Sequence, residues 1–296
     1  MNIEKIEKEL DAVCIGSYTA GHTKSQILRF VRATDNAKLV VKFAPTDDSA
    51  ACEDIAANLH GYEAIRSLGA LSLEPKELRE LTTLGDTGRA LVMIDLGTSM
   101  CGVDGGIDVV KALWNNFMHV VEKTATAKQG GTQINKDALP EFVAEVLRHF
   151  ERFSHSDVAR LATRIRAADW TSSCSKKSAL MLLDFTPDNL FVNKGILSFI
   201  DPWNQHTYLG NPAVSIGQFI ELMKIYEMRH AEQAQDWLSA QCIAVLPKLL
   251  ECDTSTIERA LRLGATLQLV LSSYVRRESN QTRAAVLHTA AHNLWV

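Results

Sequence analysis

Two aspartates and one asparagine near the middle of the chain have the side chains needed to bind a metal ion and accept a proton. Asp184 directly follows the apolar run 180–183. Asp201 directly follows the apolar run 196–200, and Asn189 lies between the two aspartates. Short apolar runs of this kind are typical of buried strands, so strand ends would hold these side chains. Carboxylate and amide oxygens bind Mg²⁺ that is shared with phosphates, and a carboxylate left free of metal could accept a hydroxyl proton. This stretch therefore indicates phosphoryl transfer.

A lysine earlier in the chain needs an anionic partner. In the run 39–44, strand alternation places Lys42 on one face with Val40 and Ala44. Because a buried, unpaired ammonium group is costly, we expect a carboxylate beside it. Glu63, on the helix expected to follow, is the candidate partner. The alternative is an edge lysine whose alkyl chain covers apolar surface while its charge stays in water.

The stretch GSYTAGHTKS, residues 16–25, nearly matches a phosphate-binding P-loop. His22 stands where that motif requires the lysine that reaches the phosphates. A P-loop also leads into a helix, whereas the run that follows, 26–33, is β-rich. A glycine loop between two strands instead suits a fold that covers the nucleotide phosphates from above. Backbone N–H groups near Gly21 and Ser25 would then face the nucleotide. A plain hairpin turn and a P-loop NTPase are the alternatives.

The elements that must position these residues divide the chain into two parts. In the first part, the runs 26–33 and 39–45 predict a hairpin, residues 49–68 predict a helix, and residues 89–97 predict a buried strand. After Gly97 helical periodicity dominates, and the two apolar runs before the aspartates are the main β interruption. The expected helices span roughly residues 2–12, 106–122, 137–152, 156–168, 213–229, 231–249 and 254–275, with one more near the C-terminus. We predict an α+β fold with domains at residues 1–95 and 96–296.

Composition excludes several classes of protein. The net charge of −4 gives no electrostatic reason to expect a nucleic-acid partner. The N-terminus does not resemble a secretory signal, and no apolar run is long enough to cross a membrane. The six cysteines are scattered without metal-ligand spacing, which favours reduced thiols. We therefore expect a cytoplasmic monomer or homodimer that binds neither nucleic acid nor membrane.

In their order along the chain, these features resemble the aminoglycoside phosphotransferase and choline kinase-like family. The strongest part comprises DFTPDNLFV at 184–192, FIDPW at 199–203 and GNPA at 210–213, where the family commonly has Gly-Asp-Pro-Ala. The similarity runs from about residue 15 to residue 225. It implies a two-lobed, protein-kinase-like fold, with a small β-rich lobe that binds the nucleotide. The larger, mostly helical lobe would carry catalysis and bind the acceptor.

The resemblance also implies roles for individual residues. Asp184 would be the catalytic base, and Asn189 and Asp201 would be Mg²⁺ ligands. Lys42 would contact the α- and β-phosphates and be held in place by Glu63.

The segment between the two lobes would bind the adenine through its backbone, in the region of Met93, Asp95 and Leu96. The implied cofactors are ATP and Mg²⁺. The implied activity is transfer of the γ-phosphate of ATP or GTP to a hydroxyl of a small acceptor, such as an antibiotic, an amino alcohol or a sugar. Acidic residues of the helical part could attract a cationic acceptor, although solvated helix faces explain them as well: Asp104, Asp108, Glu221 and Glu227.

The chain departs from the family pattern at two places. Leu182 and Leu183 replace the usual His-Gly before the catalytic aspartate. Ser215 replaces an aspartate that is common on the helix after Pro212. The missing histidine motivates an alternative function, a pseudokinase-like module that binds a nucleotide without phosphotransfer. Retention of the lysine, both aspartates and the asparagine is evidence against that alternative.

Overall fold

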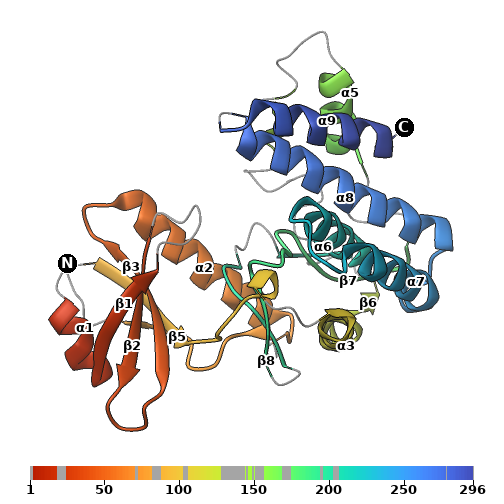
Figure 1. Cartoon of the computed structure of the whole chain (residues 1–296). Helices are drawn as coiled ribbons and strands as arrows, with labels where there is room; N and C mark the ends of the chain where they lie inside the picture. Colours follow the sequence, from red (N-terminus) through yellow and green to blue (C-terminus); the bar gives the residue numbers. More distant parts are fainter. Residues whose placement is uncertain are drawn as a thin grey trace. The chain divides into compact units, whose positions relative to one another are not determined.

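The structure is a computed structural model of the whole chain, shown in Figure 1. It describes residues 3–18, 25–70, 73–81, 88–102, 106–127, 144, 146–148, 150, 157–168, 175–193, 196–202, 207–277 and 279–295. The chain divides into two compact units. The first contains residues 1–67, 71–97 and 198–204, and the second contains residues 68–70, 98–197 and 205–296. The short segment around Asp201 thus groups with the N-terminal unit, although it lies far along the chain.

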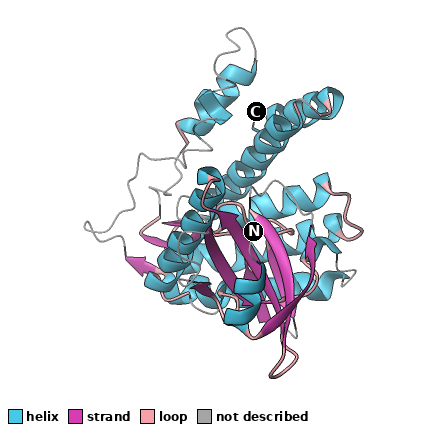
Figure 2. Ribbon diagram, turned by 90° about the vertical axis from the view of Figure 1, so that its left-hand side faces the viewer, coloured by secondary structure: helices cyan, strands magenta, loops and turns pink. Residues whose placement is uncertain are grey.

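The first unit contains a five-stranded sheet in which every neighbouring pair is antiparallel (Figure 2, magenta). The strand order is β1-β2-β3-β5-β4. The strands are β1 (Ala12–Tyr18), β2 (Gln26–Arg32), β3 (Lys38–Pro45), β4 (Arg79–Leu81) and β5 (Gly88–Ile94). The predicted hairpin is confirmed by β2 and β3, and the predicted buried strand at 89–97 is confirmed by β5. The short strand β4 was not predicted.

Alternation along these strands separates the two faces of the sheet. One face packs against α1 (Ile3–Leu10), which buries Ile6 and Leu10 in a core shared with Phe30 and Val41. The next residue along β3, Lys42, lies on the opposite face, as the sequence predicted. The helix expected at 49–68 is α2 (Ser49–Ser67), which contacts both β3 and β5.

The second unit is mostly helical. Its helices are the short 3₁₀ helix η3 (Met100–Gly102), α3 (Gly106–Thr124), α5 (Asp157–Arg166), α6 (Ala213–Ile225), α7 (Ala231–Leu250), α8 (Thr254–Arg276) and α9 (Gln281–Trp295). They confirm the helices expected in these regions. The helix expected at 137–152 lies almost entirely outside the described residues.

Short strands interrupt these helices. They are β6 (Thr126–Ala127), β7 (Lys177–Leu182), β8 (Leu190–Asn193), β9 (Ile196–Phe199) and β10 (Thr207–Gly210). One sheet has the order β10-β7-β6, and β8 pairs with β9. Strands β7 and β9 confirm the two apolar runs that precede the aspartates. Strands β6, β8 and β10 were not predicted, because each has only two to four residues and no apolar run as long as the one at 196–200.

Two glycines allow α6 and α8, which lie side by side in Figure 1, to cross at close range. A Cβ atom at Gly217 would lie 2.1 Å from the carbonyl oxygen of Leu261. A Cβ atom at Gly264 would lie 2.0 Å from the carbonyl oxygen of Val214. The backbones therefore touch where a larger residue would hold the helices apart. This crossing fixes α6, which contacts strand β7.

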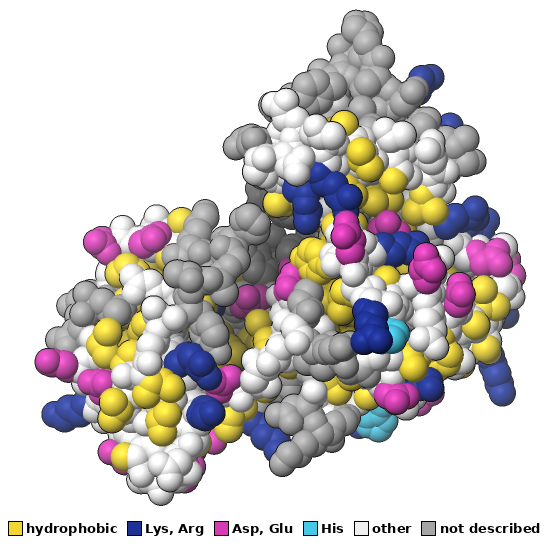
Figure 3. Space-filling view, in the orientation of Figure 1, with side chains coloured by type: hydrophobic (Ala, Val, Ile, Leu, Met, Phe, Trp, Pro, Cys, Tyr) yellow, Lys and Arg dark blue, Asp and Glu magenta, His cyan; other side chains and the backbone are white. Residues whose placement is uncertain are grey.

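On the face of the second unit visible in Figure 3, basic side chains are interspersed with acidic ones. Within the described part of the chain, no helix has the length and apolar character needed to cross a membrane.

Candidate active site

Lys42 is the centre of a buried polar cluster in the first unit. Only 3% of its side chain is exposed, and its Nζ atom lies 2.9 Å from Oδ2 of Asp54 and 3.0 Å from Oδ1 of Asp201. The same Nζ donates a hydrogen bond of 2.8 Å to Oδ1 of Asn58. Because β3 is an interior strand of the sheet and the ammonium is buried, the edge-lysine alternative is wrong.

The two carboxylates determine the charge state of Lys42. Burial alone would lower the pKa of the ammonium group, because a low-dielectric surrounding disfavours the charged form. The charges of Asp201 and Asp54 outweigh that effect and raise the pKa above its usual value of 10.5. Lys42 is therefore a fixed positive charge at neutral pH, as a phosphate-binding lysine must be.

The expected partner, Glu63, does not pair with Lys42, so this prediction was wrong. Glu63 is exposed, and Asp54 takes the role instead. The reason is the phase of α2, in which nine residues correspond to about 900°, so Asp54 and Glu63 point to opposite sides of the helix. Asn58 lies one turn after Asp54 and is fully buried. Its position in the helix's buried stripe, between Ile55 and Tyr62, is the signal in the sequence that could have identified it.

The glycine stretch leads from β1 into β2, which pair antiparallel. A strand follows the loop where a P-loop requires a helix, so the P-loop alternative is wrong. Ser25, at the end of the loop, is buried and its hydroxyl donates to Oδ2 of Asp54 at 3.0 Å. Ser25 therefore contacts the partner of Lys42. Gly21 lies outside the described residues, and its contact with a nucleotide stays a prediction.

The segment predicted to bind adenine begins with Met93 inside β5 and continues past the end of that strand at Ile94. The carboxylate of Asp95 accepts one hydrogen bond from Arg29 and one from the N–H of Gly97, both at 2.9 Å. The N–H of Asp95 itself donates to a carbonyl of β3 at 2.8 Å. These bonds attach the segment to the sheet and occupy the carboxylate and the backbone N–H of Asp95. The adenine contacts predicted for Met93 and Leu96 are not tested by these bonds.

Asp184 and Asn189 are joined within one loop of the second unit, between β7 and β8. The side-chain amide of Asn189 donates to Oδ2 of Asp184 at 2.9 Å and to its carbonyl oxygen at 3.3 Å. The loop also closes on itself, because the N–H of Asn189 donates to the carbonyl of Thr186 at 3.0 Å. The amide nitrogen is thus used to orient the aspartate. Among the residues that the structure describes, none donates a hydrogen bond to the amide oxygen, which is the atom that could bind a cation.

The beginning of this loop is anchored in the core. Leu182 and Leu183, which replace His-Gly, are both buried. The buried hydroxyl of Ser215 accepts the N–H of Leu182 at 2.9 Å. Phe185 is fully buried, with its ring centroid 4.7 Å from that of Phe117. The two departures from the family pattern therefore contribute to one apolar and hydrogen-bonded anchor, in which Ser215 binds the backbone.

Both aspartates that follow the apolar runs have left-handed backbone conformations. The φ angle is 64° at Asp184 and 52° at Asp201. Such angles cost about 1 kcal/mol or more for residues with a Cβ atom, and they concentrate at functional sites. Another contact fixes the Asp201 segment, because the hydroxyl of Tyr62 donates to the carbonyl of Phe199 at 3.3 Å. Burial raises the pKa of that hydroxyl, so it remains a donor at neutral pH.

The predicted metal ligands have suitable chemistry. Asn189 and Asp201 offer hard oxygen atoms, and Mg²⁺ is usually bound by one or two protein groups together with phosphates and water. Lys42 contacts Oδ1 of Asp201, and no hydrogen bond to its Oδ2 is found within the described parts of the chain. Among the described residues there is no group of three or more His, Cys, Asp or Glu side chains that could hold a metal by itself. Each of the two side chains, taken by itself, therefore has the chemistry of a Mg²⁺ ligand, and their shared metal stays a prediction.

Acidic residues considered for a cationic acceptor are paired with bases of the same unit. Asp108 lies 3.5 Å from Lys111, and Glu221 lies 3.5 Å from Lys224. Glu227 lies 3.6 Å from Arg283, while Asp104 is outside the described residues. These pairs agree with ordinary helix surfaces.

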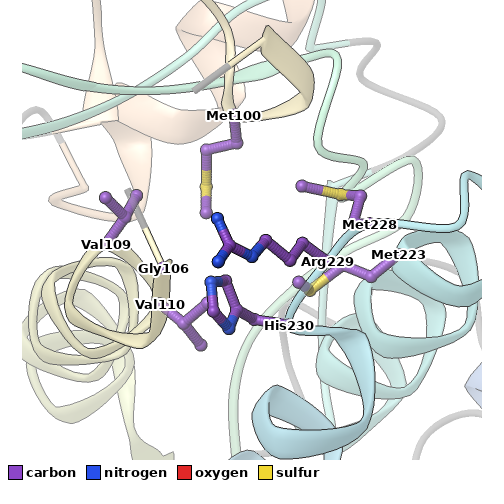
Figure 4. Close-up of a pocket in the computed structure, with 8 residues that line it drawn as sticks. All are labelled: Met100, Gly106, Val109, Val110, Met223, Met228, Arg229 and His230. Carbon is purple, nitrogen blue, oxygen red and sulfur yellow. The ribbon is translucent and has the colours of Figure 1, made fainter. Parts of the chain in front are cut away.

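A small pocket of the second unit lies where α3 and α7 begin (Figure 4). The side chains of Arg229 and His230 lie between Met100 and Val110 in this view. Its volume is about 40 Å³, which is room for a few water molecules. None of the predicted site residues lines it, and it is too small for an acceptor.

Comparisons with known proteins identify the fold of this chain but do not assign it to a sequence family. No family model and no curated protein matches the chain. The solved structure of an ethanolamine kinase from Plasmodium vivax matches with a TM-score of 0.53 and 11% identity, over 93% of this chain and 81% of that one. A macrolide 2'-phosphotransferase type I matches with a TM-score of 0.52 and 12% identity, over 98% of this chain and 95% of that one. The chain therefore has the α+β, two-lobed, protein-kinase-like fold that the sequence resemblance predicted.

Proposed function

We propose that this protein is a small-molecule kinase that transfers the γ-phosphate of ATP or GTP to a hydroxyl group of a small acceptor. The observation that carries this proposal is the cluster around Lys42. A buried lysine on an interior strand is held between Asp54 and Asp201 at 2.9 and 3.0 Å. Such a cluster supplies a fixed positive charge for nucleotide phosphates beside a carboxylate that can bind their metal.

Each residue has a role in the proposed reaction. Lys42 binds the α- and β-phosphates, and Asn189 and Asp201 would hold Mg²⁺. The metal, when bound with the nucleotide, neutralises charge that develops on the phosphate oxygens. Asp184 accepts the proton of the acceptor hydroxyl while that oxygen attacks the γ-phosphorus and the bond to the nucleoside diphosphate breaks. The hydrogen bond from Asn189 keeps the Asp184 carboxylate oriented for this transfer.

The names of the two structural neighbours support the reaction class. One is an ethanolamine kinase and the other a macrolide 2'-phosphotransferase, so both are named for phosphoryl transfer to a small molecule. For this chain the acceptor class stays open among antibiotics, amino alcohols, sugars and related metabolites.

We place the protein in the cytoplasm as a monomer or homodimer without nucleic-acid or membrane partners. Cys14, Cys52, Cys242 and Cys252 are free thiols, which agrees with that compartment.

The test is a screen of the purified protein with Mg²⁺ and ATP or GTP against amino alcohols, aminoglycosides, macrolides and sugars. Nucleotide consumption and a product that gains one phosphoryl group in mass spectrometry would identify the acceptor. We expect the Asp184→Asn variant to retain nucleotide binding and to lose about two to four decades of kcat. Asp236→Asn, an exposed aspartate of α7, is the matched control and should turn over normally.

Two results would contradict this assignment. If Asp184→Asn turned over at the wild-type rate, another group would be the base. If the wild-type protein bound magnesium and nucleotide but phosphorylated nothing in the screen, the alternative would hold. The protein would then be a nucleotide-binding module of the pseudokinase type, as the loss of His-Gly suggested.

A further inference from the structure

One stripe of α6 contacts the loop that carries Asp184 and Asn189 at three successive points. The residues that make these contacts are Ser215, Phe219 and Tyr226, which follows the last residue of α6 as its C-cap. Their separations of 4 and 11 residues place them within about 40° of one another around the helix axis. The helix therefore presents a polar, an aromatic and a second polar group along one line.

The three contacts follow the loop from its beginning to its end. Ser215 accepts the N–H of Leu182, the last residue of β7, at 2.9 Å. The ring of Phe219 packs on that of Phe185, with the centroids 6.0 Å apart. These two contacts are buried. They fix the start of the loop and leave its far end, next to Asn189, to a third contact.

That third contact is a short, charge-assisted hydrogen bond. The hydroxyl of Tyr226 donates to Oδ2 of Asp188 at 2.6 Å. Bonds from a hydroxyl to a carboxylate in this distance range are about twice as strong as neutral ones. The backbone N–H of Tyr226 donates to the carbonyl of Leu222 at 2.9 Å, and Arg283 of α9 donates to the carbonyl of the preceding residue, Ile225, at 3.3 Å. The backbone that carries the tyrosine is therefore held at the end of α6, although the side chain itself is exposed.

We propose that Tyr226 is a positioning residue for the catalytic loop. By holding Asp188 it fixes the neighbouring Asn189, whose amide nitrogen orients Asp184 and whose amide oxygen would face the metal. This inference rests on the proposed function for its effect on turnover. Its structural consequence, a loop that opens more often when the hydroxyl is removed, can be measured without any turnover.

The experiment compares Tyr226→Phe with Tyr274→Phe in the full chain. Tyr274 lies on α8, where its ring packs against Phe150 and under the Arg277 guanidinium, so it controls for loss of a tyrosine hydroxyl. Hydrogen exchange of the backbone amides in residues 184–190 is the first readout. We expect faster exchange at Thr186 and Asn189, whose N–H groups bond within the loop, in the first variant alone.

Turnover on an acceptor found in the screen is the second readout. In Tyr226→Phe we expect kcat to fall about three- to tenfold, the scale of one exposed hydrogen bond. The Mg²⁺ concentration for half-maximal rate should rise, while KM for the acceptor stays unchanged. Asp188→Asn keeps an acceptor oxygen and should retain most of the rate. Asp188→Ala should match Tyr226→Phe, and the double variant should lose no more than either single one.

The results separate the two proposals. Absence of phosphotransfer in the wild-type protein would end the proposed function and leave hydrogen exchange to decide the role of Tyr226. Wild-type exchange in Tyr226→Phe, or additive losses in the double variant, would overturn the positioning role. Faster loop exchange with non-additive losses would establish it.

Discussion

Lys42 and Asp201 are 159 residues apart in the chain, and their Nζ and Oδ1 atoms are 3.0 Å apart. The contact lies within the first unit, with which the short segment that contains Asp201 groups. The same lysine contacts Asp54, so one positive charge serves two carboxylates. Removal of that charge would leave the two carboxylates facing each other without a cation between them. We therefore expect substitution of Lys42 to affect both stability and function.

We predict that Lys42→Met lowers both stability and nucleotide binding. The substitution should lower the free energy of unfolding by about 1 to 3 kcal/mol. This is less than for a fully buried ion pair, because Asp201 is about one-third exposed. The folded pKa of Lys42 is raised, so its contribution is fully present below the unfolded pKa of about 10.5. That contribution is lost as the pH rises through the folded pKa. Urea unfolding between neutral pH and pH 11 checks this. A wild-type advantage that grew with alkalinity would contradict the prediction.

Substitutions on opposite faces of α2 should have opposite outcomes. Asp54→Ala removes a charge-assisted contact to Lys42 and leaves the Ser25 hydroxyl without this acceptor. We expect nucleotide affinity to fall by roughly one to two decades, and turnover to fall with it. Glu63→Ala changes an exposed side chain of the same helix and should leave both quantities at wild-type levels. Calorimetric titration with magnesium and a non-hydrolysable ATP analogue is the measurement. The reverse result would restore Glu63 as the partner of Lys42.

The fold was largely predictable because its signals are local. Apolar runs predicted β2, β3, β5, β7 and β9, and helical periodicity predicted the long helices. The partner of Lys42 was missed because it depends on which residues of α2 face the sheet. Glu63 has the right charge but lies on the opposite side of the helix from Asp54. Contacts between distant residues were not predictable in this way. Tyr226 and Asp188 are 38 residues apart, and nothing in either local pattern indicates their hydrogen bond.

Reactivity should differ among the cysteines of the folded protein. Cys242 is fully buried, and burial raises the pKa of its thiol, so the reactive thiolate is scarce at ordinary pH. Cys14 and Cys52 are half-buried. We expect iodoacetamide at pH 8 to modify these two well before Cys242, which should react only after unfolding in urea. Peptide mapping by mass spectrometry is the check, and early labelling of Cys242 would show that α7 opens readily.

At the crossing of α6 and α8, we predict that replacing glycine by alanine destabilises the protein, although helix propensity alone predicts the opposite. Replacing glycine by alanine within a helix normally stabilises it by roughly 1 kcal/mol. In Gly264→Ala, however, the new Cβ would lie 2.0 Å from the backbone oxygen of Val214, which cannot move without shifting α6. Overpacking of this kind costs about 1 to 3 kcal/mol, so we expect a lower urea midpoint despite the gain in propensity. Because α6 holds the loop through Ser215 and Tyr226, exchange of residues 184–190 should also rise. A higher urea midpoint would mean that the helices are not in backbone contact at this point.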